Sequence, residues 1–380
     1  MNNDYSQMPV YQAEDGITFD LLDLKVALLH YGIQVDEEVY RQFEGKARLS
    51  KSPFRCSSML LNEQVSCLVA LTGKETPFRL ILKDGKPVIT HNSHYLTEIS
   101  FHEKTTFYDQ VSSGGTPFDN LAVIQGADSL TIACLWRCEI TQSGNACAFC
   151  HTGNYVYPYQ SVSEMVEVIR YAVEVSPKVT CLKMTAGSTF NPEGEINRYA
   201  DILKAVDTAI GLDKLPTLIY LTPPADPKQI DRLFDAGARW IACDLDIWDE
   251  RLFHKICPGK ARITTRQRYL DALYHIADRY GPNRACCIFV AGVETADSLI
   301  EGASVLAERG IVPWPSPLMR FGLEEKVLAE MQPFSIDYYR TVRKETAKLF
   351  KKYELEPPGT TGSDCCLNRD IWLRRDILSQ

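Results

Sequence analysis

The chain has 380 residues, and its 41 Lys and Arg against 49 Asp and Glu give a formal charge of −8. This acidic balance argues against a general binder of nucleic acid or of anionic membranes, because both need a basic face to neutralise phosphates. No apolar run reaches the ~20 residues that span a bilayer. The acidic N-terminus lacks a basic region followed by an apolar one, so we expect no secretory signal and a cytoplasmic protein.

The first part of the chain predicts a small α+β domain, which we place at residues 1–125. Residues 17–45 show helical periodicity, and Gly32 predicts a helix end. Residues 56–95 alternate in the manner of short strands. The Asp84–Gly85 pair between two apolar runs predicts a β-hairpin there.

The middle of the chain, residues 126–322, alternates apolar runs of strand length with amphipathic stretches of helix length. The expected strands are 129–135, 179–184, 216–221, 239–245, 285–291 and 311–315. The expected helices are 161–176, 195–211, 226–236, 247–257, 264–281 and 295–309. Six such units predict right-handed crossovers and a parallel sheet, in an α/β fold with a partial (β/α)6 barrel. In such barrels the chemistry lies at the C-terminal ends of the strands.

The last part, residues 323–380, predicts a C-terminal extension. Its charged amphipathic helix at 335–353 is expected to pack on the outside of the barrel. The extension ends in a polar segment with two adjacent cysteines, Cys365 and Cys366. These cysteines have four open interpretations: a metal ligand, a hydrogen donor, a sulfur acceptor, or an unremarkable surface pair.

The chain contains 13 cysteines. An odd number in a chain without a secretory signal favours metal binding or catalysis over a disulfide framework. Four of them lie in apolar, strand-like runs and are expected to be buried core thiols: Cys181, Cys243, Cys286 and Cys287.

The strongest chemical signal is a run of cysteines that begins where the first barrel strand ends. Cys134, Cys138, Cys147 and Cys150 fall within 17 residues in a loop with Gly and Asn, where core packing does not explain them. Thiolates in this density predict a soft-metal site. A structural zinc ion needs four closed ligands, whereas an iron–sulfur cluster can rest on three, and His151 is poorly placed to be a fourth. We favour the cluster, with Cys138 as first ligand and Cys134 as the alternative.

These residues resemble the radical S-adenosylmethionine (SAM) enzymes, whose three-cysteine loop after the first barrel strand usually reads CxxxCxxC with an aromatic before the last Cys. Here the CxxC ending and Phe149 match, but eight residues separate Cys138 from Cys147. The longer loop resembles a subgroup encoded beside nitrilases in bacteria, and the later strands resemble biotin synthase. The resemblance implies a TIM-like barrel, a [4Fe-4S] cluster on Cys138, Cys147 and Cys150, and SAM bound beside it.

The resemblance also implies which positions after the strands contact SAM. They are Phe149, Thr185, Ala186, Gly187, Ser188, Thr222, Asp244, Asp246, Gly292 and Glu294. A turn of small residues lets a ligand approach the backbone closely, and a carboxylate can accept hydrogen bonds from two ribose hydroxyls. Asp246 and Glu294 have an equally good alternative as caps of the helices that follow them.

The implied activity is reductive cleavage of SAM to a 5′-deoxyadenosyl radical, which abstracts hydrogen from a small-molecule substrate. An electron donor such as flavodoxin or ferredoxin would be a partner, and nucleic acid and membranes would not. One alternative is transfer of a SAM fragment such as the 3-amino-3-carboxypropyl group, so the enzyme is expected to be an oxidoreductase or a transferase. The other is a zinc-stabilised binding protein without catalysis.

Overall fold

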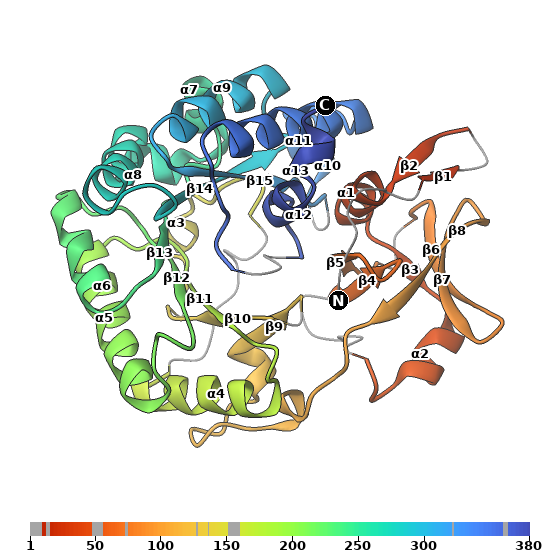
Figure 1. The fold of residues 1–380 in the computed structure, drawn as a ribbon, viewed down its shortest axis with the longest axis horizontal. Coiled ribbons are helices and arrows are strands. Elements are labelled where there is room, and N and C mark those ends of the chain that lie inside the picture. Colours follow the sequence, from red (N-terminus) through yellow and green to blue (C-terminus); the bar gives the residue numbers. More distant parts are fainter. Residues whose placement is uncertain are drawn as a thin grey trace.

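The computed structural model describes residues 10–12, 16–47, 56–72, 75–126, 128–135, 137–150, 160–320, 323–359 and 364–380. Its larger part is a curved seven-stranded sheet in the order β15-β14-β13-β12-β11-β10-β9 (Figure 1). The strands are β9 (Ala122–Gln125), β10 (Ser129–Ala133), β11 (Cys181–Thr185), β12 (Thr217–Tyr220), β13 (Trp240–Ala242), β14 (Ala285–Ala291) and β15 (Val312–Pro317). β10 to β15 are parallel, and β9 is antiparallel to β10. The predicted α/β fold with a partial (β/α)6 barrel is confirmed.

Helices cover the outer face of this sheet (Figure 1). They are α4 (Val162–Val175), α5 (Pro192–Ala209), α6 (Asp231–Asp235), α7 (Glu250–Ile256), α8 (Arg266–Tyr280) and α9 (Ala296–Ala307). Local sequence fixes their starts: Ser161 and Glu164 form a reciprocal capping box on α4, and Asn191 caps α5 ahead of Pro192. All six coincide with helices expected from the sequence.

Strand alternation turns one set of side chains toward the helices and the other toward the inside of the curve. Residues such as Leu182 and Ile219 are fully buried beneath the helices. The alternate positions face the inside of the curve and include Lys183, Tyr220 and Trp314. We call this inner space the lumen. Polar groups that line a lumen rather than the helix layer are available for chemistry.

The N-terminal part forms a second sheet in the order β3-β6-β7-β8-β4-β5, with a separate ribbon of β1 and β2. Its elements are β1 (Val10–Gln12), β2 (Thr18–Asp20), α1 (Leu21–Tyr31), β3 (Gln34–Val35), α2 (Glu37–Phe43), β4 (Cys56–Leu61), β5 (Val65–Ala70), β6 (Phe78–Lys83), β7 (Lys86–His91) and β8 (His94–Phe101). The hairpin at Asp84–Gly85 is confirmed, because it joins the antiparallel β6 and β7. The helical expectation for 17–45 is wrong in part: α1 ends at Gly32 as predicted, but β3 then separates it from α2.

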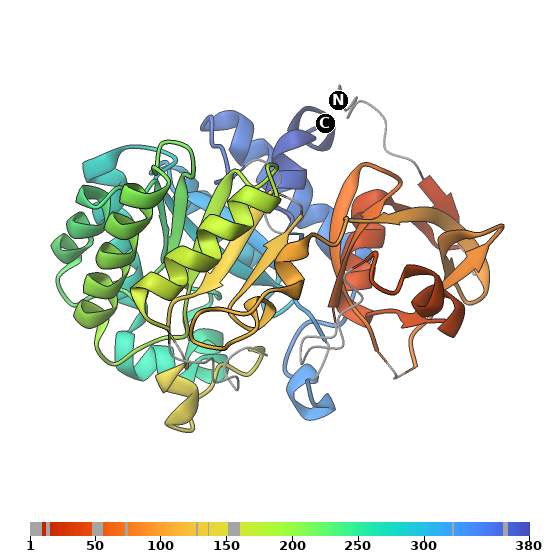
Figure 2. The same ribbon diagram turned by 90° about the horizontal axis from the view of Figure 1, so that it is seen from below.

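The C-terminal extension contains α10 (Glu325–Leu328), α11 (Ile336–Lys352), α12 (Asn368–Leu373) and α13 (Arg375–Leu378). Its helices lie at the junction of the two sheets (Figure 2), and α11 packs on α9 outside the barrel, as expected. Buried ion pairs tie it to α1: Lys25 Nζ lies 2.7 Å from Asp370, and Arg343 contacts Asp20 at 3.0 Å and Asp23 at 2.9 Å. These pairs fix the N-terminal part against the tail.

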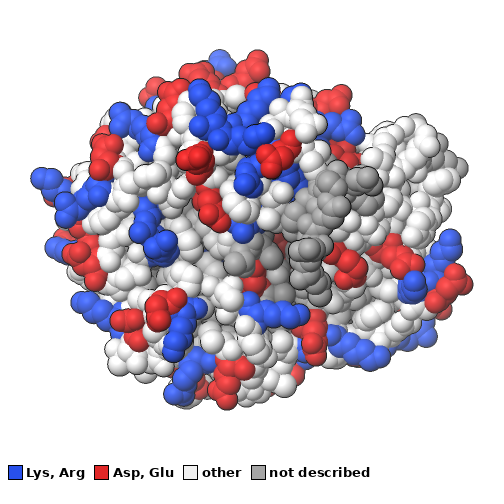
Figure 3. Space-filling model, in the orientation of Figure 1, with Lys and Arg blue, Asp and Glu red and all other residues white. Residues whose placement is uncertain are grey.

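The surface gives no single charged field on the face drawn in Figure 3, where Lys and Arg are interspersed with Asp and Glu. Among the residues that the structure describes, no helix has the length and apolar character needed to cross a membrane.

Candidate functional site

The cysteine loop follows β10 and carries one short helix, α3 (Glu139–Gln142). Cys138 lies immediately before α3, and Cys147 and Cys150 lie after it; all three side chains are half-buried. The Cys150 amide donates to the Cys147 carbonyl (3.0 Å), so the two close into one turn. The three predicted cysteines therefore lie on one loop, and each is partly accessible to solvent.

The turn after β11 holds this loop from one side. The Cys134 amide donates to the Thr185 carbonyl (2.8 Å), and the Glu139 amide donates to the Ser188 carbonyl (2.9 Å). Between them, Gly187 packs so closely that a Cβ on it would lie 2.4 Å from the Cα of Cys138. Only glycine permits that approach, which explains the small-residue turn predicted to matter here.

The segment after α7 holds the loop from the other side. The Ala148 amide donates to the Ile256 carbonyl (2.8 Å). A Cβ on Gly259 would lie 2.5 Å from the carbonyl oxygen of Asn145. Phe149, next to Ala148, is half-buried against the main core. Contacts on both flanks fix the loop before any ligand binds.

Cys134 differs from the other three loop cysteines. Its side chain is 2% exposed, its Sγ lies 3.8 Å from the Ile132 carbonyl, and burial raises its pKa far above the usual range. A thiol held protonated in the core is a poor metal ligand. This placement favours Cys138 over Cys134 as the first ligand. His151 lies outside the described residues.

Cys147 has a neighbour that the sequence did not indicate. The buried thiol of Cys257, at the end of α7, donates a hydrogen bond that lowers the pKa of Cys147, and the ammonium of Lys260 lowers it further. Among the described residues, no three Cys, His, Asp or Glu side chains converge as ligands of one metal ion. The three loop thiols are therefore not arranged as a closed site for a single metal ion.

A small pocket of about 70 Å³ opens beside the loop, at the C-terminal ends of β11, β12 and β13. It brings together residues expected at separate strand ends: Ala186, Gly187, Ser188, Thr222 and Asp244. Five further residues complete its lining: Glu195, Tyr220, Leu221, Lys260 and Tyr269. Its volume is below the ~300–1,000 Å³ of typical ligand pockets, so it accommodates one end of a ligand.

A lysine ties the two predicted aspartates together at this pocket. The Lys260 ammonium forms an ion pair with Asp246 and donates to the Asp244 carbonyl oxygen (2.8 Å). Burial, and then the charge of Asp246, raise the pKa of Asp244 to about 7. The alternative for Asp246 as a helix cap is wrong, because Asp249 caps α7 through the Leu252 amide (2.8 Å).

Glu195 is the most buried carboxyl of the pocket, at 3% exposure. Burial raises its pKa to about 8, although the neighbouring hydroxyls of Thr222 and Tyr199 lower it in part. It projects from the first turn of α5. A buried carboxyl with a raised pKa can bind a ligand group that is cationic or that forms a hydrogen bond with it.

Five of the residues predicted to contact SAM do not line this pocket: Phe149, Thr185, Asp246, Gly292 and Glu294. Glu294 and Gly292 have structural contacts of their own. Glu294 accepts hydrogen bonds from the Trp248 and Asp249 amides (2.8 and 2.9 Å), so it anchors the loop before α7, while Thr295 caps α9. Gly292 has φ 107° and packs against α11, where a Cβ would lie 2.8 Å from the Tyr339 hydroxyl.

The sequence of this region matches a known family. Residues 143–301, from the cysteine loop through the first half of α9, match the model of the radical SAM superfamily. This region is a radical SAM domain. The matched region includes Cys147 and Cys150, and Cys138 lies just before it.

Three known proteins are similar to this chain. The bacteriochlorophyllide c C-7(1)-hydroxylase of Chlorobaculum limnaeum is 23% identical over 327 residues, which are 80% of this chain and 79% of the relative. A radical SAM methyltransferase from Sphaerobacter thermophilus is 15% identical, with coverage of 77% and 81% and a TM-score of 0.45. The hydrogenase maturase HydG from Carboxydothermus hydrogenoformans is 13% identical, with a TM-score of 0.43; the match covers 60% of this chain and 53% of HydG.

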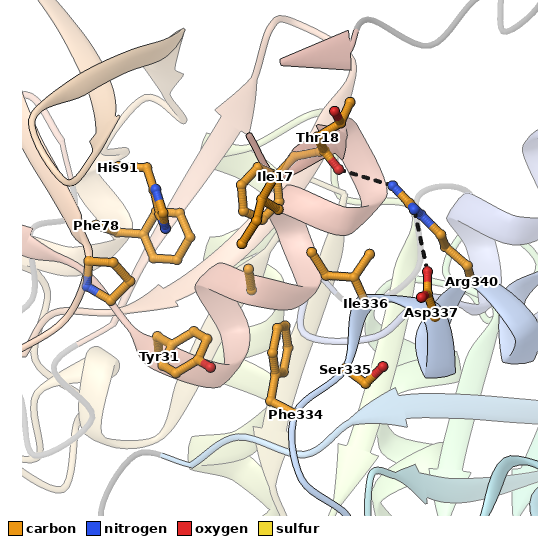
Figure 4. A pocket seen from close by; sticks show the side chains of 13 residues that line it. Ile17, Thr18, Tyr31, Phe78, His91, Phe334, Ser335, Ile336, Asp337 and Arg340 are labelled. Carbon is orange, nitrogen blue, oxygen red and sulfur yellow. Dashed lines mark hydrogen bonds and ion pairs between the residues drawn. The ribbon is translucent and has the colours of Figure 1, made fainter. Parts of the chain in front are cut away.

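The molecule also has a larger hollow, of about 690 Å³, between α1, β6, β7 and the start of α11. Figure 4 shows Phe78, Tyr31 and Phe334 turned into it, and Arg340 at its rim bonded to the Thr18 carbonyl and to Asp337. The hollow is larger than the pocket at the strand ends, but none of its lining residues belongs to the cysteine loop. We therefore identify the candidate active site by its neighbouring thiols and buried charged groups, and not by the size of the cavity.

The tail cysteines lie inside the molecule. Cys366 is 4% exposed and Cys365 is half-buried, and Cys366 Sγ lies 3.5 Å from the Ser316 hydroxyl of β15. The interpretation of a surface pair is wrong for this reason. The four cysteines expected in the core are buried as predicted: Cys181, Cys243, Cys286 and Cys287.

Proposed function

We propose that this radical SAM enzyme cleaves SAM reductively and that the resulting 5′-deoxyadenosyl radical abstracts hydrogen from a small-molecule substrate. The single observation that carries the proposal is the contact between Gly187 and Cys138, because it joins the cysteine loop to the strand-end pocket. Because the cysteine loop packs directly on the turn that lines the pocket, a cluster on the loop would lie next to a ligand in the pocket and could transfer an electron to it.

Cys138, Cys147 and Cys150 would hold a [4Fe-4S] cluster. Three half-buried thiols on one loop suit a cluster, whose ligands are distributed over several irons, better than a closed single-ion site. When bound, the cluster would supply the electron that breaks a carbon–sulfur bond of SAM. The chain contributes the rigid loop, and the neighbouring ammonium of Lys260 favours thiolate at Cys147.

The pocket residues would bind and orient SAM. Glu195 and the carbonyls of the turn at 185–188 suit the amino group of the methionyl end, because an ammonium beside Glu195 would stabilise its ionised form. Asp244, which Lys260 fixes through its backbone carbonyl, suits the ribose hydroxyls as a hydrogen-bond acceptor. Its pKa of about 7 means that binding also selects the ionised form.

A low-potential electron donor such as flavodoxin or ferredoxin, and a cytoplasmic location, complete the proposal. The cysteines whose side chains the structure describes form no disulfide with one another, which fits a reducing compartment.

The test begins with the cysteine loop. Anaerobically reconstituted protein should contain iron and sulfide, and Cys147→Ala or Cys150→Ala should abolish both. Cys134→Ala is the matched control, because this buried thiol is close in sequence to Cys138 but points into the core. Retention of full iron in Cys147→Ala, or zinc in place of iron, would overturn the proposed cluster.

The reaction is tested on the same protein with SAM and dithionite, by mass spectrometry of the nucleoside products. We expect 5′-deoxyadenosine, and weaker SAM binding in Asp244→Asn than in Asp226→Asn, an exposed cap after β12. Appearance of 5′-methylthioadenosine instead would show cleavage of the other bond and favour transfer of the 3-amino-3-carboxypropyl group.

A further inference from the structure

The Cys365–Cys366 pair is held between the two sheets of the molecule. On one side the Leu68 amide of β5 donates to the Asp364 carbonyl (3.1 Å), and on the other the Leu367 amide donates to the Pro315 carbonyl of β15 (3.2 Å). In Figure 1 the blue trace of the tail enters the open side of the half-barrel before α12. Backbone bonds at both ends therefore fix the pair at the lumen.

The two thiols are adjacent in space as well as in sequence. Their Sγ atoms lie 3.7 Å apart, and both cysteines are free. A hydrogen bond from Cys365, and then one from Ser316, lower the pKa of Cys366 to about 7, whereas the pKa of Cys365 is raised. The hydrogen bond between the two sulfurs therefore favours thiolate at Cys366 and thiol at Cys365.

The surroundings of the pair are polar, which core packing does not require. Lys183 is 1% exposed in the lumen, its Nζ lies 6.0 Å from the ring centroid of Trp314, and its charge favours thiolate at both cysteines. A buried ammonium near two thiols favours their ionised form.

The pair also adjoins the proposed SAM pocket. Cys366 Sγ lies 3.5 Å from the hydroxyl of Ser316, two residues after Trp314 on β15, and the ring centroid of Trp314 lies 6.4 Å from that of Tyr220. Tyr220 and Asp244 line the pocket at the strand ends. A radical formed there thus has these thiols within the same lumen.

We propose that the Cys365–Cys366 pair is a hydrogen-atom donor that returns hydrogen to the substrate radical; this rests on the function proposed above. An S–H bond is weaker than most C–H bonds, so transfer from sulfur to a carbon radical is favourable. The S–H bond breaks, a C–H bond forms, and the unpaired electron remains on sulfur, where the adjacent thiolate shares it. One electron from the low-potential donor and one proton then restore the thiol.

This role specifies a class of reaction. The substrate loses one hydrogen atom to 5′-deoxyadenosine and regains one from the pair. The reaction therefore inverts a stereocentre or rearranges the carbon skeleton, without net oxidation of the substrate. The regained hydrogen comes from solvent, because thiol protons exchange with water.

The test needs no substrate. Reconstituted holoenzyme is supplied with SAM and dithionite in D2O, so that the 5′-deoxyadenosyl radical itself becomes the acceptor. The O–D bonds of water and alcohols and N–D bonds are too strong to react, so deuterium reaches 5′-deoxyadenosine only from an S–D donor or from the phenolic O–D of a tyrosine. Tyr220 lines the pocket, and loss of the enrichment in Tyr220→Phe would assign the donor to the phenol instead of the thiols. We expect enrichment in the natural protein and natural abundance in the double variant Cys365→Ser with Cys366→Ser. Cys286→Ser is the matched control, since Cys286 is fully buried and also acts on Tyr220, and it should retain the enrichment.

A second readout needs neither cluster nor SAM. One equivalent of diamide should convert the pair in the natural protein to a disulfide, making the peptide that contains residues 364–369 lighter by two hydrogen atoms. Undeuterated 5′-deoxyadenosine from the natural protein, deuterium that persists in the double variant, or a disulfide to any other cysteine would overturn the inference. Absence of 5′-deoxyadenosine would instead overturn the function on which it rests.

Discussion

Gly187→Ala should disturb the cysteine loop without touching any thiol. A Cβ at this position would lie 2.4 Å from both Cα and Cβ of Cys138 and 2.7 Å from its amide nitrogen. Carbon atoms in contact prefer about 3.5 Å, so the loop must move by roughly 1 Å. The obstructing atoms include backbone, and no change of side-chain rotamer can relieve the clash.

That displacement is large for a metal site, where productive geometry is held within about 0.5 Å. We therefore expect most of the iron to be lost on anaerobic reconstitution, as measured by iron and sulfide analysis and by the visible absorption of the cluster. Overpacking of this kind also costs about 1–3 kcal/mol of folding free energy, which denaturant titration of the apo protein would register.

Gly194→Ala, seven residues later in the first turn of α5, is the matched control. A Cβ on Gly194 meets only the side chain of Asn191, with its amide nitrogen at 2.4 Å, and this side chain can move. Its iron content should stay at the natural level. If Gly187→Ala bound as much iron and sulfide as Gly194→Ala, the contact with Cys138 would not be what positions the cluster.

Two further predictions concern buried charges. Because burial raises the pKa of Glu195 from 4.5 to about 8, its contribution to stability is present below pH 4.5 and is lost as pH rises through 8; Glu195→Gln should remove this part of the pH dependence in urea titrations, and an unchanged slope would contradict it. Lys25→Met removes the nearer cation of buried Asp370 and leaves Arg374 at 3.6 Å, so it should cost about 3 kcal/mol, the lower end for a broken buried pair, whereas the exposed Lys86→Met should cost under about 1 kcal/mol; equal losses of melting temperature would refute the argument.

The sequence predicts the barrel well because its signals are local and repeated. Each strand from β10 to β15 is an apolar run, and each following helix carries its own periodicity and cap, such as Ser161 on α4. Parallel strands end at one edge of the sheet, so residues after β11, β12 and β13 were expected to meet. The pocket lined by Ser188, Thr222 and Asp244 follows from that rule.

The residues missed by sequence reasoning are those whose roles depend on side-chain reach. Lys260 lies 14 residues after Asp246, in an irregular turn before α8, and no periodicity shows that its ammonium returns to the strand ends. Glu195 looks like an ordinary acidic residue in the first turn of a helix, a favourable and common position. Its 3% exposure is a property of packing against α5's neighbours, which composition does not reveal.

The tail has a double role that explains why a polar segment is buried. A half-barrel leaves edge strands, and an exposed edge such as β15 invites wrong pairing unless something covers it. The segment at 364–367 donates a backbone bond to β15 and accepts one from β5, so it bridges two sheet edges at once. A single bond to each edge leaves no strand-length pattern in the sequence. The same bridge puts Cys365 and Cys366 at the lumen, so the device that closes the fold also supplies the thiols nearest to the chemistry.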